Sequence, residues 1–371
     1  MDITPDISGR LARLRSLMGE RGWDAVVVRR IADIQWLTGI SHAFDKEQAH
    51  TAVVTRERAW LHTDSRYYNA FVEGLPAGSS WEMDQEPVAH PAWAAARLSE
   101  AGARVVAVEE AMGLGFFDEL SAAVGDGASF PRMSGEIVDL RMVKDADEID
   151  RMRRAQALTD ASFDHICGYI RPGQTEMEIM LELQSYLLTH GADGSSFSSI
   201  VASGPNGANP HARPTYRKVE EGDFIVMDWG ATVDDYKSDM TRTVCVGEPS
   251  AEQRRVYDVV RETHEACAAM VRAGVLGCDV HNLSVRMIAD AGYGEYYGHG
   301  LGHGVGLEGH ERPIFNPGYD KPVPAGSVMT VEPGIYLPGR FGVRLEDYGL
   351  VTEDGFDVFT ASTHDLVCVP C

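Results

Sequence analysis

Two aspartates flank a short turn-forming segment between two apolar runs, and this arrangement constrains the fold more than any other feature. Asp228 ends the apolar run 224–227, and Asp239 opens a second apolar run. The midpoint of the two aspartates falls between Val233 and Asp234. An antiparallel hairpin folded about that midpoint would place the two carboxylates opposite each other on one face of a sheet.

A pair of glutamates repeats this pattern further along the chain. Glu332 and Glu346 are equidistant from Gly339, which lies in the segment 337–341, a strong turn signal. A hairpin folded about Gly339 again places two carboxylates opposite each other. The sequence therefore predicts two hairpins that bring four carboxylates to one place.

Four carboxylates that face one another inside a protein need cations to neutralise them. Acidic residues near turns are usually solvated, but Asp228 and Glu332 both end strand-like apolar runs, where an inward charge is costly. Two divalent ions about 3.5 to 4 Å apart, sharing a water or hydroxide, form a recurring hydrolytic site. With His303 as a nitrogen donor and no thiolate, the ligand set favours Mn²⁺, Co²⁺ or Fe²⁺ over a closed structural zinc site.

The segment 298–306 alternates glycine with other residues. Its five glycines within nine residues make a helix unfavourable, and the spacing is not that of a dinucleotide-binding fingerprint. We expect an extended, closely packed backbone with His299, Leu301, His303 and Val305 on one side.

Two further histidines lie in or near glycine-rich segments. His310 follows His303 by seven residues, and His211 ends the segment 204–211. A single histidine is more often structural or exposed than catalytic. Several histidines beside a predicted metal site instead indicate proton transfer or stabilisation of an oxyanion.

These residues together resemble the metallopeptidase family of prolidase (Xaa-Pro dipeptidase) and aminopeptidase P, whose fold is called pita-bread. Methionine aminopeptidase and the metal-free creatinase share this fold. The resemblance rests on five blocks in the family's order, Asp228–Gly230, Ser238–Thr243, His299–Glu311, Thr330–Tyr336 and Val343–Asp347. Weaker similarity in Asp33–Gly39 and Thr63–Tyr67 extends it over nearly the whole chain.

The resemblance implies a ligand set for two divalent metal ions. Asp228 would chelate one ion, Asp239 and Glu346 would bridge both, and His303 and Glu332 would complete the other ion's shell. A metal-bridging hydroxide would be the nucleophile, and Glu332 would carry a proton to the leaving nitrogen. No ligand position departs from the family pattern, which argues against a creatinase-like protein. We expect Mn²⁺, with Co²⁺, Fe²⁺ and Zn²⁺ as alternatives.

The resemblance also implies residues that handle the substrate. His310 and His211 match positions that contact the substrate and steady the tetrahedral intermediate. His299 matches a wall of the pocket that receives proline. Arg344 and Tyr336 would support the site from behind, with Arg344 near the bridging carboxylates.

The implied function is hydrolysis of the peptide bond before proline in a small peptide with proline at the second position. That bond is a tertiary amide without an N–H, which proteases that dock substrates as an added strand need. The motifs leave open whether the enzyme is a dipeptidase or an aminopeptidase. A non-peptidase amide or C–N hydrolase on the same scaffold is an alternative, and a non-catalytic binding module is a remote one.

The pattern of elements predicts two domains in a chain of 371 residues. An N-terminal α/β layer domain over 1–140 precedes an α+β domain over 141–371, for which the resemblance implies the pita-bread fold. The expected helices are 9–21, 92–101, 116–123, 147–170, 176–190, 253–273 and 280–291, and the expected N-terminal strands are 25–28, 51–54, 60–62 and 105–108.

Net charge and cysteine content limit the binding partners and the cellular location that we expect. The net charge of −23 opposes binding to nucleic acid or to an anionic membrane, and no stretch approaches 18 apolar residues. Because Met1–Asp6 lacks the pattern of a signal peptide, we expect a cytoplasmic protein. The resemblance favours a homodimer or a homotetramer, and we expect the homodimer. The six cysteines show no disulfide framework, and Cys368 and Cys371 are expected in a frayed tail.

Overall fold

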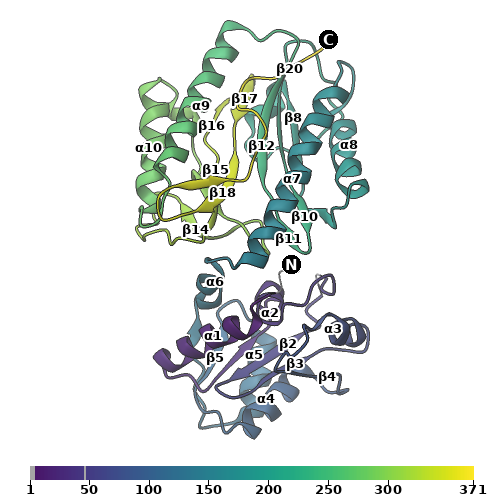
Figure 1. Ribbon diagram of the computed structural model, residues 1–371, viewed down its shortest axis with the longest axis vertical. Coiled ribbons are helices and arrows are strands. Elements are labelled where there is room, and N and C mark those ends of the chain that lie inside the picture. Colours follow the sequence, from purple (N-terminus) through teal and green to yellow (C-terminus); the bar gives the residue numbers. More distant parts are fainter. Residues whose placement is uncertain (1–4, 46) are drawn as a thin grey trace. The chain divides into compact units, whose positions relative to one another are not determined.

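The computed structural model describes residues 5–45 and 47–371, so the first four residues of the stretch inspected for a signal peptide lie outside it. The chain divides into two compact units, Met1–Arg141 and Met142–Cys371 (Figure 1). Within the described ranges, no helix is long and apolar enough to cross a membrane.

The N-terminal unit contains one six-stranded mixed sheet in the order β4-β3-β2-β1-β5-β6. Its strands are β1 (Ala25–Val28), β2 (Thr51–Thr55), β3 (Ala59–His62), β4 (Trp81–Asp84), β5 (Val106–Glu109) and β6 (Arg132–Met133). Its helices are α1 (Ile7–Arg21), α2 (Ile31–Thr38), α3 (Tyr68–Gly74), α4 (His90–Glu100), α5 (Leu114–Val124) and α6 (Glu136–Arg141).

Helix α1 illustrates how local sequence sets these elements. The Asp6 side chain accepts a hydrogen bond from the backbone N–H of Gly9 at 2.9 Å and caps the helix. Leu11, Leu14 and Met18 form the buried face, and Gly22 ends the helix in the left-handed conformation. The helix predicted over 9–21 is confirmed, as are the helices near 92–101 and 116–123.

The C-terminal unit combines two pairs of long helices with several small sheets. Its helices are α7 (Ala146–Tyr169), α8 (Glu176–Thr189), α9 (Ala251–Met270) and α10 (Gly277–Asp290), with 3₁₀ turns η1 (Gly204–Ala208) and η2 (Gly294–Tyr296). Its strands are β7 (Gly194–Ser195), β8 (Ile200–Ser203), β9 (Phe224–Trp229), β10 (Ala231–Val233), β11 (Tyr236–Lys237), β12 (Met240–Val246), β13 (Gly302–Gly304), β14 (Glu311–Phe315), β15 (Val328–Val331), β16 (Gly334–Leu337), β17 (Phe341–Arg344), β18 (Asp347–Val351), β19 (Phe356–Val358) and β20 (Cys368–Val369).

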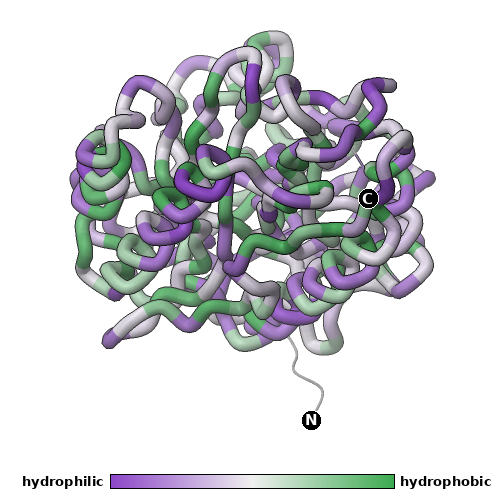
Figure 2. Tube along the Cα trace, turned by 90° about the horizontal axis from the view of Figure 1, so that it is seen from above, coloured by the Kyte–Doolittle hydropathy of each residue, from purple (hydrophilic) through white to green (hydrophobic). Residues whose placement is uncertain are grey.

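Two of these sheets carry most of the core. One is ordered β20-β12-β9-β8, and the other is ordered β14-β13-β15-β18-β19. Helices α7 and α8 pack on the first sheet through one apolar cluster, and α9 and α10 pack on the second through another. Hydrophobic and hydrophilic residues alternate over short distances along the chain (Figure 2), as expected of elements that bury one face. The four helices predicted for this part of the chain are confirmed.

The glutamate hairpin has the predicted register. Strand β16 pairs with β17, with Leu337 opposite Phe341, and β15 pairs with β18, with Val331 opposite Asp347. Both pairings share one register, so Glu332 and Glu346 lie opposite each other in the gap between them. The turn predicted around Gly339 is therefore confirmed.

The aspartate hairpin has a different register from the predicted one. Strand β9 pairs with β12 so that Asp228 lies opposite Thr241, and not opposite Asp239. The prediction is wrong by two residues because the turn is centred on Asp234 and Asp235, whose φ values are 48° and 69°. A shift of two residues keeps both aspartates on the same face of the sheet.

The glycine-rich segment is not helical, as predicted, but it is extended only over Gly302–Gly304, where glycine is required for close packing. A Cβ atom at Gly302 would lie 2.1 Å from the carbonyl oxygen of Thr330. The expectation that His299, Leu301 and His303 share a face is wrong for Leu301, which packs in the core while the two histidines line a cavity. Only Gly302–Gly304 forms a strand, so side chains do not alternate regularly over the whole segment.

The C-terminal residues form a strand, which corrects the expectation of a frayed tail. Strand β20 pairs in parallel with β12, and Cys368 lies opposite Cys245. Among the described residues, all six cysteines are free thiols.

Candidate metal centre

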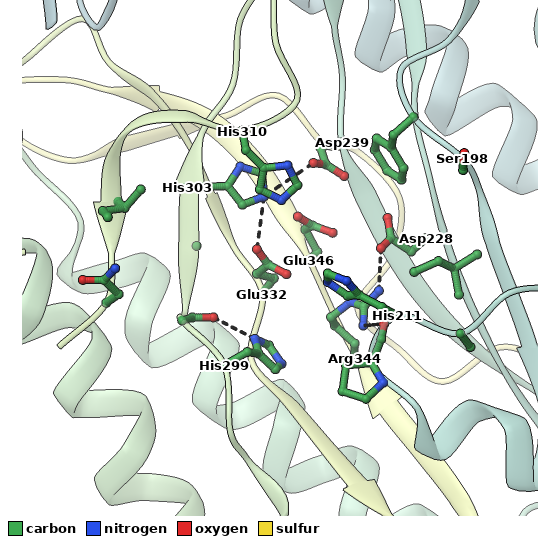
Figure 3. A pocket seen from close by; sticks show the side chains of 18 of the residues that line it. Ser198, His211, Asp228, Asp239, His299, His303, His310, Glu332, Arg344 and Glu346 are labelled. Atoms are coloured by element: carbon green, nitrogen blue, oxygen red, sulfur yellow. Dashed lines mark hydrogen bonds and ion pairs between the residues drawn. The ribbon is translucent and has the colours of Figure 1, made fainter. Parts of the chain in front are cut away.

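A cavity of about 580 Å³ in the C-terminal unit contains nearly all of the predicted site residues (Figure 3). Nine of them line it, namely His211, Asp228, Asp239, His299, His303, His310, Glu332, Arg344 and Glu346. Tyr336 is the exception, and it lies behind the wall, buried. A volume of this size is typical of a site for a small ligand.

Strand ends bring the four carboxylates together. Asp228 is on β9, Asp239 immediately precedes β12, Glu332 follows β15, and Glu346 precedes β18. The backbone N–H of Glu346 donates to the carbonyl oxygen of Thr241 at 3.1 Å, and this contact joins the two hairpins. This contact, with the hydrogen bonds between Thr243 and Arg344, places the two hairpins side by side, so both pairs converge as predicted.

Burial and mutual repulsion favour the protonated forms of Asp239 and Glu346 when no cation is bound. Burial, followed by the charge of Asp228, raises the pKa of Asp239 well above its ordinary value. Burial and the charge of Asp239 do the same to the pKa of Glu346. The buried Oδ1 atom of Asp228 has no hydrogen-bond partner among the described residues. A bound cation would satisfy that oxygen and allow the carboxylates to ionise.

His303 is oriented as a ligand would be. Its Nδ1 lies 3.1 Å from the carbonyl oxygen of Gly304, so this nitrogen carries the proton and Nε2 faces the carboxylates. Nε2 is 3.3 Å from Oε1 of Glu332 and 3.7 Å from Oδ2 of Asp239. Burial by itself lowers the pKa of His303, but the hydrogen bond and charge of Glu332, with the charge of Asp239, raise it to about 9.

The donor set fits the divalent ions that the resemblance implies. One ligand atom from each of Asp239, His303 and Glu346 lies within 4.8 Å of the others, and all three residues are buried. A protonated His303 would otherwise be the main cation facing Glu332, whose pKa is lowered to about 2 because His303 and other charges outweigh the effect of burial. Oxygen donors with one imidazole suit ions such as Mn²⁺.

Arg344 makes hydrogen bonds that position two of the carboxylates. Its Nη2 donates to Oδ2 of Asp228 at 2.5 Å, and its Nε donates to the hydroxyl of Thr241 at 3.0 Å. The Thr241 hydroxyl in turn donates to Oε2 of Glu346 at 2.7 Å. Arg344 therefore contacts the predicted terminal ligand Asp228 directly, and it reaches the predicted bridging carboxylate Glu346 through Thr241.

A chain of hydrogen bonds runs from Arg344 to His299. Nη1 of Arg344 donates to the hydroxyl of Tyr336 at 2.8 Å, and that hydroxyl lies 3.1 Å from Nε2 of His299. Nδ1 of His299 lies 2.7 Å from the carbonyl oxygen of Gly300, so Nδ1 carries the proton and Nε2 accepts from Tyr336. Burial lowers the pKa of His299, which agrees with a neutral ring.

The other two predicted histidines lie on different sides of the group (Figure 3). The ring of His310 is 4.0 Å from the ring of His303, centroid to centroid. Burial, followed by the charge of His303, lowers the pKa of His310 to about 4. His211 follows η1, is exposed, and lines the cavity near Arg344.

Two threonines that support the ligands were missed in the sequence. The hydroxyl of Thr330 accepts from the backbone N–H of His303 at 3.0 Å and donates to Oε1 of Glu332 at 3.3 Å. Thr241 holds Glu346 in the same manner. Each threonine is two residues from a predicted ligand, so the strand period of two could have placed both on the ligand face.

Two family models match the chain and together span most of it. A model of metallopeptidase family M24 matches residues 150–353. A model of the creatinase/prolidase N-terminal domain matches residues 10–143.

Relatives named as peptidases align over nearly the full length. A Xaa-Pro dipeptidase of Pyrococcus horikoshii is 30% identical over 99% of this chain and 100% of its own. The structure of a Xaa-Pro dipeptidase from Bacillus anthracis has a TM-score of 0.92 at 34% identity, covering 98% of this chain and 100% of its own. The structure of an X-Pro aminopeptidase from Thermotoga maritima has a TM-score of 0.87 at 33% identity, covering 97% and 100%.

Proposed function

The chain belongs to metallopeptidase family M24, and from that premise we propose that it hydrolyses the peptide bond before proline in small peptides with two bound divalent ions. The observation that carries the proposal is the buried group of Asp239, His303 and Glu346 within 4.8 Å, beside Asp228 and Glu332 in one cavity. Relatives named as Xaa-Pro dipeptidase and X-Pro aminopeptidase support the choice of substrate.

The five predicted ligands would hold the two ions. When bound, the ions would supply positive charge that lowers the pKa of a shared water molecule and polarises the carbonyl group under attack. Thr241 and Thr330 fix the carboxylates of Glu346 and Glu332, and Gly304 fixes the tautomer of His303. These supports keep the donors in place before a substrate arrives.

We assign the proton transfer to Glu332. Its Oε1 is the atom that contacts both His303 and the hydroxyl of Thr330, which leaves Oε2 to exchange a proton. Its side chain is 18% exposed and lines the cavity, so it can reach the attacking water and the leaving nitrogen. A tertiary amide nitrogen needs that proton to leave as the amine of proline.

His310 would stabilise the oxyanion that forms on the substrate carbonyl. Because the pKa of His310 is lowered to about 4, the ring is neutral at pH 7 and donates one N–H. His211 lines the same cavity and would contact the substrate, while His299 and Arg344 shape the wall for the proline ring.

An exposed cation in the cavity wall favours the dipeptidase over the aminopeptidase. Arg213 lines the cavity and is exposed, whereas Arg344 is buried and engaged with Asp228. A dipeptide ends in a free proline carboxylate, which Arg213 would attract. A longer peptide has a neutral amide at that position.

Hydrolysis of short peptides tests the proposal. The protein is stripped with a chelator, reloaded with Mn²⁺, and assayed on Ala-Pro, Ala-Pro-Pro and Ala-Ala. We expect Mn²⁺-dependent release of alanine from Ala-Pro, slower release from Ala-Pro-Pro, and little from Ala-Ala. Faster cleavage of Ala-Pro-Pro would instead make the enzyme an aminopeptidase. Bound Mn²⁺ with no cleavage of any peptide would favour a hydrolase for another amide or C–N bond.

Replacing His310 by alanine should lower turnover and leave the metal content unchanged. The lost N–H donor should reduce kcat about 10²-fold, because removal of one oxyanion donor has effects of this order. Elemental analysis and kcat are measured together, with His190→Ala, an exposed histidine on the surface, as the control. A variant that loses bound metal would make His310 a ligand.

The homodimer, the cytoplasmic location and the identity of the ion as Mn²⁺ stay predictions. Sedimentation of the purified protein tests the first, and elemental analysis of protein isolated without added metal tests the third.

A further inference from the structure

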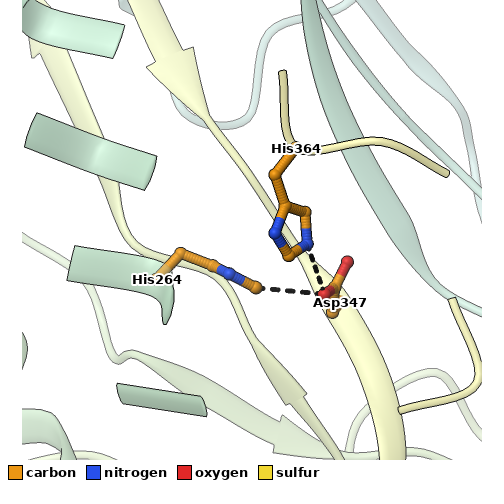
Figure 4. Close-up of side chains that lie close together, drawn as sticks. All are labelled: His264, Asp347 and His364. Carbon is orange, nitrogen blue, oxygen red and sulfur yellow. Dashed lines mark hydrogen bonds and ion pairs between the residues drawn. The ribbon is translucent and has the colours of Figure 1, made fainter. Parts of the chain in front are cut away.

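A second group of potential ligands lies on the other side of strand β18, away from the cavity. It consists of His264 on α9, Asp347 at the start of β18, and His364 in the segment after β19. One ligand atom from each residue lies within 4.8 Å of the others. Figure 4 shows both imidazole rings directed at the carboxylate of Asp347. None of the three lines the cavity described above.

The two oxygens of Asp347 have different environments. Nη2 of Arg242 donates to Oδ1 at 2.8 Å. Oδ2 faces the two histidines, with Nε2 of His364 at 2.7 Å and Nε2 of His264 at 3.6 Å. The carboxylate therefore lies between the guanidinium and the two imidazoles, and Oδ2 is the oxygen that faces both rings.

His264 is an unusual residue for a hydrophobic helix face. Its side chain is fully buried, and its Nε2 has no hydrogen-bond partner among the described residues. A buried polar nitrogen without a partner is rare, and here it points at a carboxylate oxygen too far away for a hydrogen bond. An ion between the two atoms would give this nitrogen a partner.

The separation between His264 and Asp347 is close to that of two ligands on a four-coordinate ion. Ligands that bind at about 2.0 to 2.1 Å in a tetrahedral site lie roughly 3.3 Å from one another. The 3.6 Å between Nε2 of His264 and Oδ2 of Asp347 is close to that value, and His364 would move back slightly from 2.7 Å. Because His364 is 30% exposed, water can supply the fourth ligand and the ion can enter from solvent.

The surroundings of His364 also suit a ligand. Its Nδ1 lies 3.7 Å from Oε1 of Glu265, and a carboxylate at this nitrogen is typical of metal-binding histidines. Binding would displace the proton from Nε2, which then coordinates through its lone pair.

We propose that His264, Asp347 and His364 form a separate binding site for one transition-metal ion of the zinc class. Two imidazoles and one carboxylate are ligands that Zn²⁺ accepts in tetrahedral geometry. The ion joins α9, β18 and the segment that leads to β20. Arg242 already donates to the carbonyl oxygens of Ser362 and Thr363 in that segment. The ion would therefore attach the same segment to β18 at a second point.

Counting ions per chain tests the site without relying on catalysis. The protein is stripped with a chelator, reloaded with excess Zn²⁺, desalted, and analysed by elemental analysis. We expect His364→Ala to bind one ion fewer than the wild type, and His190→Ala to bind as many as the wild type. His364 is partly exposed, so its truncation should leave the fold intact. Equal counts in the wild type and His364→Ala would overturn the proposal.

Two further measurements test the site even if the His364→Ala variant does not fold. His264→Gln should also bind one ion fewer, and anomalous diffraction at the zinc edge from wild-type crystals should show a peak between the three side chains. A crystal without that peak would overturn the proposal even if a variant failed to fold. Asp239→Ala, which disrupts the cavity group, should keep this ion, so failure of the peptidase proposal and failure of this one are separable.

Discussion

Asp239→Ala and Glu346→Ala should each abolish metal-dependent hydrolysis while the protein stays folded. Each carboxylate is predicted to serve both ions, so its loss removes ligands from two centres at once. We expect kcat/KM on Ala-Pro to fall at least about 10³-fold. Elemental analysis should show fewer ions per chain than in the wild type. A purified variant that retains wild-type activity would exclude the two-ion mechanism.

Replacing Asp239 should also change the stability of the protein, and it should make the metal-free form more stable. The pKa of Asp239 is raised in the folded state, so its contribution to stability is present at acid pH and is lost as the pH rises above the ordinary carboxyl value near 4. Asp239→Asn removes this loss. In EDTA at pH 7.5, the variant should therefore unfold at a higher urea concentration than the wild type, and the difference should shrink toward pH 4.

Added metal should reverse that order. Ions at about 1,000 times their dissociation constant stabilise the folded protein by about 4 kcal/mol per site. The wild type should gain this stability, and Asp239→Asn should gain much less. Asp235→Asn, in the turn of the same hairpin, is the matched control and should behave as the wild type in both conditions.

Arg344→Met should destabilise the protein and weaken metal binding. The Arg344 side chain is 3% exposed, and its guanidinium contacts Asp228, the Tyr336 hydroxyl and the Thr241 hydroxyl. Its removal leaves a buried carboxylate without its partner, which costs about 3 to 5 kcal/mol. Because Arg344 orients a predicted ligand, we also expect the affinity for Mn²⁺ to fall about 10- to 100-fold.

Urea unfolding in EDTA and titration with Mn²⁺ measure the two effects. Arg340→Met is the matched control, because Arg340 is on the same hairpin but is half exposed and pairs with Glu252 on the surface. Surface pairs contribute about 0 to 1 kcal/mol. If Arg344→Met were as stable as Arg340→Met and bound Mn²⁺ equally well, the ion pair with Asp228 would have no supporting role.

The glutamate hairpin was predictable because its turn has a strong local signal. Pro338 and Gly339 mark the tip, so counting outward from it places Glu332 opposite Glu346. The tip of the aspartate hairpin has no glycine. Asp234 and Asp235 adopt positive φ instead. Aspartate tolerates this conformation but does not predict it as glycine does, so the position of the tip, and with it the register, was predicted wrongly.

Two other prediction errors arose because tertiary contacts, which local sequence patterns do not indicate, determine the structure at those places. Helix α2 (Ile31–Thr38) was not predicted because six of its eight residues are buried, so it has no polar face to reveal a helical period. Strand β20 was expected to be frayed because its partner β12 and the core cluster that buries Val369 are far away in sequence. By contrast, the two-domain fold was predictable from the resemblance, and the family models and related structures confirm it.

The shared register of the two pairings around Gly339 limits how this region can change in evolution. Strand neighbours alternate between faces, so one residue inserted into a single arm between Glu332 and the tip would turn that carboxylate away from its counterpart. Residues inserted in the turn between Leu337 and Phe341 do not change which face of the hairpin the side chains of either strand occupy. We expect natural length variation among homologous chains to collect at that turn and to be absent from the arms.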